Sequence, residues 1–444
     1  MAPAERNMLI CTHHTGEPHG ILGAQIAATY LSRRLAIQSI VVGLKRGFQI
    51  ERFLAFVEEY YRGKNPIIAF SHLAGRKDIF DLMATLQQMG FTTVLGGPQA
   101  LQDYAGEPDA DRFPHRFHGL RDRVDVAIQG PVDSMRPECL EKMGQTFQFA
   151  WHNDLYLDVD WSNIYTFSEK LEQLDVQVAQ VLAAIGCPYA AKESAVLLDP
   201  PLSIADKAPK VLVRSCGCIF CDVAWDKGFR GHVSQASLLA QVRALPENSN
   251  RKITFELIDE YPVATLQALL DKTLAEGIRL SQINLVCRVD AVMRHGEALQ
   301  KILKVARARG IRIMFSSIGF ESFSEKILAH FNKGVRVGEI LECVELLRRL
   351  KDEFGETLLY RRDEGSTHGF IHPTPWDNSE TVPEMDRNIF LHRLFDDILP
   401  DHSTPLIIHH GSALGDWLRQ IEESTNVTFG RDGTWIEWWN HTEI

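Results

Sequence analysis

The chain has 444 residues, 45% hydrophobic and 24% charged, a composition typical of a globular protein with two or three domains. Its formal net charge of -11 argues against a surface that binds nucleic acid by neutralising phosphates. The sequence shows no apolar run long enough to span a membrane and no signal peptide, and its eight cysteines are scattered. We therefore expect reduced thiols and a cytoplasmic protein with neither a membrane nor a nucleic-acid partner.

Residues 1–135 alternate short apolar runs with amphipathic segments. The apolar runs predict strands at 7–14, 39–44, 66–73, 91–98 and 124–131. Because continuous β-branched runs alternate with helices, we predict a parallel, doubly wound sheet of the Rossmann-like type, with helices on both faces.

Ligands of such sheets bind beyond the carboxyl ends of the strands. In this domain those ends carry small residues, glycines and histidines, which let the backbone approach a large ligand closely. They are Thr12, His13, His14, Ser71, His72, Gly96, Gly97, Pro98 and Gly130. The same residue types also suit the turns of any doubly wound sheet. No G-x-G-x-x-G follows the first strand, which argues against a dinucleotide.

The rest of the chain falls into three expected parts. Residues 136–205 are irregular and are expected to form a linker region. Strand–helix pairs resume with a strand at 210–215 and predict a partial or full (β/α) barrel over 206–400, whose chemistry would gather at the carboxyl ends of its strands. Residues 401–444 form a C-terminal extension.

Three of the eight cysteines lie within six positions, directly after the strand expected at 210–215. They are Cys216, Cys218 and Cys221. Three thiolates can hold a [4Fe-4S] cluster and leave one iron without a protein ligand. With a fourth ligand such as His232 they could instead hold zinc, and the cysteines by themselves leave both readings open.

Several stretches, in the same order, resemble the family of cobalamin (B12)-binding radical S-adenosylmethionine (SAM) enzymes. "TTVLGGPQA" is similar to the fourth strand of its cobalamin domain, and "CIFCDVA", "FELIDEY", "CRVDAV", "IGFESFSEKILAHFNKG" and "FIHPTPWDNSETV" are similar to successive parts of its barrel. The chain departs from the family in three places. Its first cysteine interval holds only Gly217 where the family has three residues, "QGPVDS" replaces a glycine–glutamate pair, and the D-x-H-x-x-G motif is absent.

The resemblance implies an enzyme with a [4Fe-4S] cluster, SAM and cobalamin. The three cysteines would hold the cluster, and the strand-end residues of the first domain would contact cobalamin. The residues implied to bind SAM are Phe220, Asp259, Glu260, Arg288, Glu321 and Ser322. Cys287 is either a stand-in ligand or a small buried hydrophobe.

The commonest reaction of the family is methylation of an unactivated carbon or phosphorus of a small molecule. The resemblance implies that this reaction uses a 5'-deoxyadenosyl radical and methylcobalamin, with electrons from a flavodoxin- or ferredoxin-type donor. It does not identify a catalytic residue. Three alternatives stay open: a non-methylating rearrangement or cyclisation, an atypical SAM cleavage, and a non-catalytic metal- or cobalamin-binding protein with a degenerate cluster loop.

Overall fold

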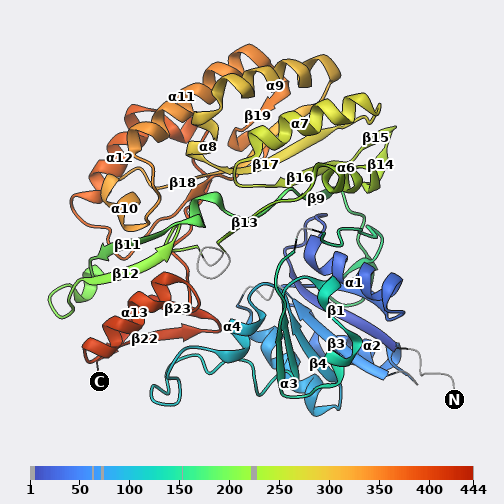
Figure 1. Cartoon of the computed structure of the whole chain (residues 1–444). Coiled ribbons are helices and arrows are strands. Elements are labelled where there is room, and N and C mark those ends of the chain that lie inside the picture. Colours follow the sequence, from blue (N-terminus) through green and yellow to red (C-terminus); the bar gives the residue numbers. More distant parts are fainter. Residues whose placement is uncertain (1–5, 63–64, 72–74, 153, 222–227, 444) are drawn as a thin grey trace. The chain divides into compact units, whose positions relative to one another are not determined.

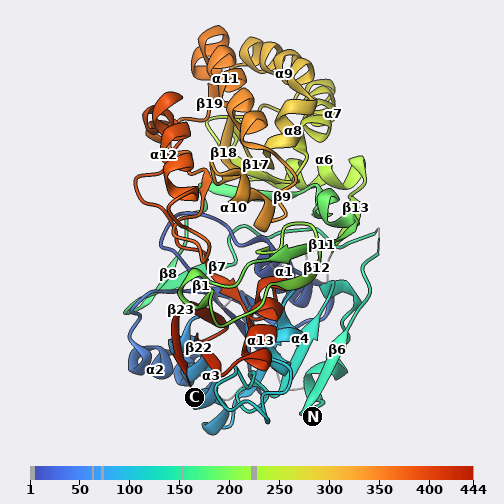
Figure 2. The same cartoon turned by 90° about the vertical axis from the view of Figure 1, so that its left-hand side faces the viewer.

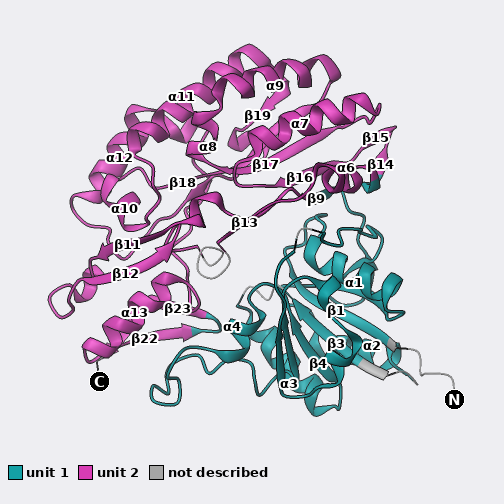
Figure 3. Cartoon of the chain, viewed as in Figure 1, with its two compact units in different colours: residues 1–180, 244–246, 432–434 teal, residues 181–243, 247–431, 435–444 magenta. Residues whose placement is uncertain are grey.

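The computed structural model describes residues 6–62, 65–71, 75–152, 154–221 and 228–443. These residues form two compact units, coloured separately in Figure 3. Unit 1 comprises residues 1–180, 244–246 and 432–434, and unit 2 comprises residues 181–243, 247–431 and 435–444. Among the described residues, no helix has both the length and the apolar character needed to cross a bilayer.

Unit 1 is built around one sheet whose strand order is β6-β5-β4-β3-β1-β2-β7-β8. The strands are β1 (Arg6–His14), β2 (Gln38–Lys45), β3 (Asn65–Ser71), β4 (Thr92–Gly96), β5 (Val126–Gln129), β6 (Gln145–Gln148), β7 (Ile164–Phe167) and β8 (Leu171–Gln173). All neighbours are parallel except β7 and β8. The five strands predicted for the first domain are confirmed, and β6 to β8 come from the segment expected to be a linker.

The helices of unit 1 pack on its sheet, and α2 and α3 do so through buried apolar residues. They are α1 (Leu22–Arg34), α2 (Ile50–Tyr60), α3 (Lys77–Gln88) and α4 (Ala100–Ala105), together with the 3-10 turns η1 (Val132–Ser134) and η2 (Pro137–Glu141). Helices α2 and α3 share one buried cluster with Leu9 and Cys11 of β1. Met8 and Ile10 are also buried, and they point to the other face because side chains alternate along a strand. Helix α1 packs along β1 and β2 (Figure 1).

Unit 2 contains a second sheet, of order β19-β18-β17-β16-β9, with β20 also paired to β18. Its strands are β9 (Val178–Leu182), β16 (Thr254–Ile258), β17 (Gln282–Arg288), β18 (Arg312–Glu321), β19 (Leu358–Leu359) and β20 (Gly369–Phe370). The pairs of β17 with β16 and β18, and of β18 with β19 and β20, are parallel. Among the described residues the sheet does not close, so the barrel is partial.

Helices alternate with these strands as the sequence predicts. They are α6 (Gln235–Ala244), α7 (Pro262–Ala275), α8 (Val289–Arg294), α9 (Gly296–Arg309), α10 (Glu325–His330), α11 (Val337–Phe354) and α12 (Thr381–Leu391). Figure 1 shows α7, α8, α9 and α11 along one side of the sheet. Two small antiparallel pairs complete this part: β10 (Ala184–Gly186) with β13 (Phe229–His232), and β14 (Glu247–Asn248) with β15 (Arg251–Lys252).

The strand expected at 210–215 forms, but not where we predicted it. It is β12 (Val211–Cys216), and it pairs antiparallel with β11 (Glu193–Leu198) as a two-stranded ribbon outside the parallel sheet. The edge position next to β16 is taken by β9 instead. The prediction failed because strand propensity is local, whereas the choice of partner depends on distant residues.

The C-terminal residues form a small three-stranded sheet. It contains β21 (Ile408–His409), β23 (Trp435–Glu443) and β22 (Val427–Asp432), beside helix α13 (Ala413–Ser424) (Figure 2). Its core includes Trp417, and one buried cluster joins it to Val211 and Val213 of the ribbon and to Ile219 of the cysteine loop. The ribbon and the C-terminal sheet therefore support the loop that carries the cysteines.

Candidate functional site

The cysteine loop begins where β12 ends at Cys216. Gly217 adopts a φ of +81°, a conformation that glycine tolerates best, and it turns the chain inward so that Cys218 is buried. Cys221 is half-buried, and its backbone N–H donates to the Cys218 carbonyl at 3.2 Å. Residues 222–227, which follow, lie outside the described part of the chain.

The turn after α10 holds this loop in place. The Ile219 N–H donates to the Phe331 carbonyl at 3.1 Å, and the Asn332 side-chain amide donates to the Gly217 carbonyl at 2.7 Å. The Phe220 ring packs edge-on against Phe331, with ring centroids 5.0 Å apart. The "HFNKG" stretch, which resembles the family motif, thus serves here as the support of the cysteine loop.

Arg288, the last residue of β17, is 3% exposed and directs its guanidinium at this loop. Its Nη1 donates to Cys218 Sγ at 3.3 Å, its Nη2 to the Lys333 carbonyl at 2.6 Å and its Nε to Asp290 Oδ1 at 2.9 Å. The guanidinium also lies 3.9 Å from the centroid of the Tyr189 ring. Burial disfavours its charge, but Cys218 and Asp290 raise the pKa of Arg288 above its usual value, so it stays cationic.

Glu321 and Lys333 form a buried ion pair next to this arginine. The Lys333 Nζ lies 2.9 Å from Glu321 Oε1, and the two residues are 4% and 9% exposed respectively. Two glycines make room for the pair: a Cβ on Gly319 would lie 2.6 Å from Glu321 Oε1, and one on Gly369 would lie 2.7 Å from Glu321 Oε2. Burial opposes the charge of Lys333, but Glu321 and Cys218 raise the pKa of Lys333.

The two acidic residues after β16 have different surroundings. Asp259 accepts hydrogen bonds from the Tyr261 N–H at 2.9 Å and from Thr265 Oγ1 at 2.7 Å, so its carboxylate orders the start of α7. Glu260 lies among the charges of the site. Burial raises the pKa of Glu260, while the cations Lys333 and Arg288 oppose that rise. Of the two carboxylates, Glu260 is thus the one placed to meet a ligand cation.

The structure gathers most of the residues implied to bind SAM. Phe220, Glu260, Arg288 and Glu321 all lie in contact or electrostatic range of Lys333. Ser322 follows Glu321 directly, is 1% exposed and accepts a hydrogen bond from the Ser324 N–H at 3.2 Å.

Three residues near this site were not predicted from the sequence to take part in it: Cys187, Tyr189 and Lys333. The pattern "GCPY" just after a strand is a signal that could have pointed to the first two, and the "NKG" of the family stretch contains the third. Cys287, by contrast, is 2% exposed, and burial raises its pKa well above the usual value, so it behaves as a small core hydrophobe.

A single zinc ion would need the cysteine sulfurs close together, because each Zn–S bond is about 2.3 Å long. Among the residues that the structure describes, no group containing these cysteines brings three ligand atoms within 4.8 Å of one another. A [4Fe-4S] cluster binds its thiolates on different irons and tolerates wider separations.

In unit 1, those residues implied to contact cobalamin that the structure describes lie at the carboxyl edge of β5, β4, β3 and β1, which are neighbours in the sheet. Gly97 has a φ of +119°, and a Cβ there would lie 3.2 Å from Ser71 Oγ. His14 is 4% exposed, its Nδ1 accepts from the Gly16 N–H at 2.9 Å, and its Nε2 is buried with no hydrogen-bond partner among the described residues. Burial first, and then the charge of Lys45, lowers the pKa of His14.

The other residues implied to contact cobalamin are Thr12, His13, Gly96, Pro98, Gly130 and His72. Thr12 is fully buried, and His13 Nδ1 lies 3.4 Å from Arg76 Nη1. Gly130 has a local structural reason to be glycine, because a Cβ there would collide with the Phe149 carbonyl oxygen. Gly96 ends β4 and Pro98 follows it, at the same edge of the sheet. His72 lies outside the described residues.

With the sheets, the cysteine loop and the buried charges described, the fold of the chain can be compared with solved structures, and it is similar to that of a cobalamin-dependent radical SAM enzyme. The solved structure of the cobalamin-dependent S-adenosylmethionine radical enzyme OxsB with aqua-cobalamin bound matches 97% of this chain with a TM-score of 0.54 and 13% identity. The chain spans 64% of the length of OxsB. This match confirms, at the level of the fold, the resemblance that the motifs predict.

A second solved structure, Elp3 of the archaeon Methanocaldococcus infernus with an N-terminal deletion, overlaps 39% of this chain and 43% of its own at 19% identity. Its TM-score of 0.25 is too low to carry an argument. No protein-family model and no curated protein sequence matches the chain.

Proposed function

We propose that this chain is a radical SAM enzyme that uses cobalamin to methylate an unactivated carbon or phosphorus of a small molecule. The observation that carries the proposal is the hydrogen bond from the buried Arg288 guanidinium to Cys218 Sγ, at 3.3 Å. Metal ligands are commonly oriented and tuned by such outer partners, and a cation beside the sulfur suits the thiolate form that binds metals.

The residues present fit both groups that the resemblance implies. Thiols supported by a buried cation suit an iron–sulfur cluster. In unit 1, small residues at the strand ends and the unpartnered Nε2 of His14 suit the approach of a large ligand such as a corrin. When bound, the cluster supplies the electron for reductive SAM cleavage and cobalamin supplies methyl-carrying capacity.

The charges around Lys333 suit the amino-acid end of SAM, which is a zwitterion. Glu260 would accept from the ammonium group, and the cations Arg288 and Lys333 would balance the carboxylate. Lys333 donates one of its three N–H hydrogen bonds to Glu321 Oε1, and its other N–H groups could donate to a ligand. Phe220 offers an apolar wall for the adenine. Asp259 would act on the site by ordering α7.

The proposed transferred group is methyl, because methyl transfer is what the family resemblance favours. A small-molecule substrate and an external donor of the flavodoxin or ferredoxin type belong to the same proposal. A place among the tailoring enzymes of natural-product biosynthesis would suit this chemistry.

The test starts from protein purified and reconstituted with iron and sulfide without oxygen. Iron, sulfide, zinc and cobalamin are quantified, and the products of SAM with a strong reductant are then separated. We expect about four irons per chain, bound cobalamin, 5'-deoxyadenosine and S-adenosylhomocysteine.

Other product patterns identify the alternatives. 5'-Deoxyadenosine without S-adenosylhomocysteine, in the presence of bound cobalamin, would indicate a radical enzyme that does not methylate. Methylthioadenosine would indicate an atypical SAM cleavage. Zinc, or no iron in a folded chain, would overturn the proposal, because the radical chemistry requires the cluster.

A further inference from the structure

The two ends of the β11–β12 ribbon meet beside the cysteine loop. A Cβ on Gly217 would lie 3.1 Å from the Cβ and 3.2 Å from the Cα of Ala190, so the chain returns from the ribbon to the place where it left. Between these points the ribbon closes on itself, with Glu193 opposite Cys216. Residues 191–217 are therefore an excursion that begins and ends at one point of the fold.

Without that excursion, the cysteine spacing changes. With residues 191–217 left out, the chain would run from Cys187 through Pro188, Tyr189 and Ala190 directly to Cys218, and then through two more residues to Cys221. Three residues would separate the first two cysteines, which is the interval that the chain lacks when Cys216 is taken as the first one. The three-residue interval between the first two cysteines is thus present in the folded chain, although an excursion interrupts it in the sequence.

Cys187 also adjoins the far end of the same loop. Its backbone N–H donates to the Gly228 carbonyl at 3.2 Å. The backbone segments around residues 186 and 228 pass so closely that a Cβ on Gly186, whose φ is +77°, would collide with the Gly228 carbonyl oxygen. The segment 186–190 therefore borders both the start and the end of the loop that carries Cys218 and Cys221.

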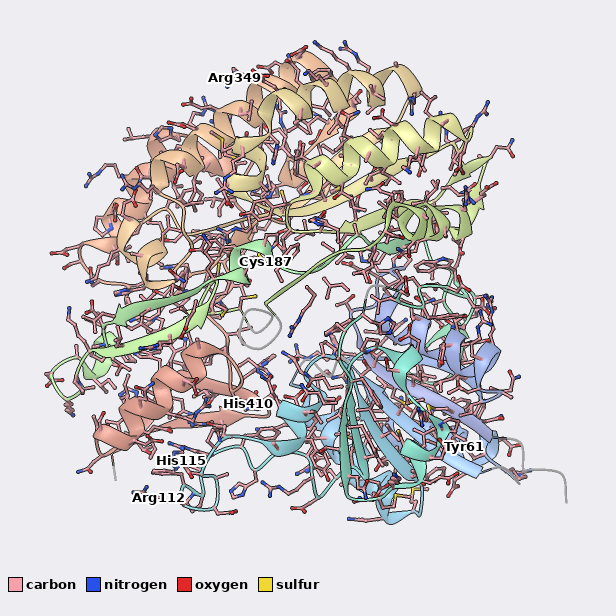
Figure 4. All side chains as sticks on the ribbon, viewed as in Figure 1. Tyr61, Arg112, His115, Cys187, Arg349 and His410 are labelled. Atoms are coloured by element: carbon pink, nitrogen blue, oxygen red, sulfur yellow. The ribbon has the colours of Figure 1, made fainter. Side chains whose placement is uncertain are left out.

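Cys187 and Cys218 face the same charges. Arg288 donates to Cys218 Sγ at 3.3 Å, and its guanidinium acts on the Cys187 thiol as well. Tyr189, two residues after Cys187, lies under that guanidinium at 3.9 Å from ring centroid to Cζ. Burial raises the pKa of Cys187 to about 11, with Glu260 adding to the rise and Arg288 opposing it. Cys187 directly follows β10, which is the next strand along the chain after β9, and it is labelled in Figure 4.

Cys216 occupies the other face of its strand. Val211, Val213 and Ser215 are buried, whereas Leu212 and Arg214 between them are exposed. Because side chains alternate along a strand, Cys216 lies on the same face as Leu212 and Arg214, and it is half-buried there. Its cross-strand neighbour Glu193 is exposed.

We infer that Cys187, and not Cys216, is the thiolate that completes the iron–sulfur site with Cys218 and Cys221, and that residues 191–217 are an insertion that splits the cysteine motif. This inference rests on the proposed function, because it assigns the ligands of the same cluster. It replaces a shortened loop with a complete one and makes Cys216 dispensable for metal binding.

Two matched variants test the assignment. Cys187→Ala and Cys216→Ala each remove one sulfur from a half-buried position. After anaerobic reconstitution, iron and acid-labile sulfide are counted and the electron paramagnetic resonance of the reduced protein is recorded. We expect Cys216→Ala to keep about four irons and the wild-type signal, and Cys187→Ala to fall below about one iron per chain. Circular dichroism checks that both variants fold.

A second measurement uses the wild type and so does not depend on how a variant folds. The chain is alkylated with iodoacetamide before and after reconstitution, and each cysteine is quantified by mass spectrometry. We expect reconstitution to protect Cys187, Cys218 and Cys221 and to leave the alkylation of Cys216 unchanged.

The outcomes separate this inference from the proposed function. A wild-type chain that takes up no iron overturns both. In a wild type that does bind iron, the assignment alone fails if Cys216→Ala loses iron, if Cys187→Ala retains it, or if reconstitution protects Cys216 instead of Cys187.

Discussion

The buried pair of Glu321 and Lys333 makes a sharp prediction about stability. Lys333→Met removes the cation and leaves the Glu321 carboxylate in a site where it is only 9% exposed. At the observed 2.9 Å, the attraction lost is about 6 kcal/mol with an effective dielectric constant of about 20. Part of that is offset by the desolvation of the lysine in the native protein. The measured loss in the free energy of unfolding should therefore be about 3–5 kcal/mol.

The double variant Glu321→Met with Lys333→Met should recover most of this loss. Replacing a whole buried ion pair by apolar side chains of similar volume is often neutral, because no charge is left without a partner. The φ of +63° at residue 321 strains methionine and glutamate alike, so it does not bias the comparison. Lys326→Met serves as the control, since Lys326 is 43% exposed and its pair with Asp199 should contribute less than about 1 kcal/mol.

The assay is urea unfolding followed by pulsed hydrogen exchange of the β17 and β18 peptides, so that the signal belongs to unit 2. The pKa of Lys333 is raised above its usual 10.5, so the stability from its charge is fully present below pH 10.5 and is lost only as the pH rises through that higher pKa. At pH 8 the measurement therefore captures all of it. A single variant within 1 kcal/mol of the control, or a double variant as unstable as the single one, would refute the reasoning.

Two further predictions concern unit 2. Burial lowers the pKa of His368 from 6.5 to about 4. The stability that the neutral imidazole provides is therefore present above pH 6.5 and falls by about 3 kcal/mol as the pH drops toward 4. Urea unfolding midpoints measured across that pH range should show this fall in the wild type and not in His368→Asn. Gly186→Ala should cost more stability than Gly231→Ala and should reduce iron uptake. Both glycines have positive φ, at +77° and +115°, but only at residue 186 would a Cβ meet another chain segment, so equal melting temperatures would contradict this.

Much of the fold could be predicted from local patterns. The strands β1 to β5 are apolar runs buried on both faces, and helices such as α9 and α11 carry a stripe of apolar residues at helical spacing. These signals lie within one element and need no knowledge of its neighbours. The motif "IGFESFSEKILAHFNKG" also placed Glu321 at the site.

The pairing of β12 could not be predicted in the same way, although one hint was present. Its residues alternate between buried and exposed, as in a ribbon with one covered face, whereas a central parallel strand is buried on both faces. The alternation shows only that one face is covered and does not say which strand lies alongside. The strand alongside β12 is Glu193–Leu198, a segment that was not predicted from the sequence to be a strand.

The sequence by itself determined the α/β class, the order of the elements and the presence of a cysteine loop next to acidic and basic strand ends, because each depends on residues close together along the chain. Only the tertiary structure decided that β9 is the first strand of the second sheet. It also decided that Cys187, which precedes Cys216 by 29 positions, borders the loop that carries Cys218. Proximity along a chain and proximity in space differ wherever an excursion returns to its starting point. The contact of Gly217 with Ala190 is such a return.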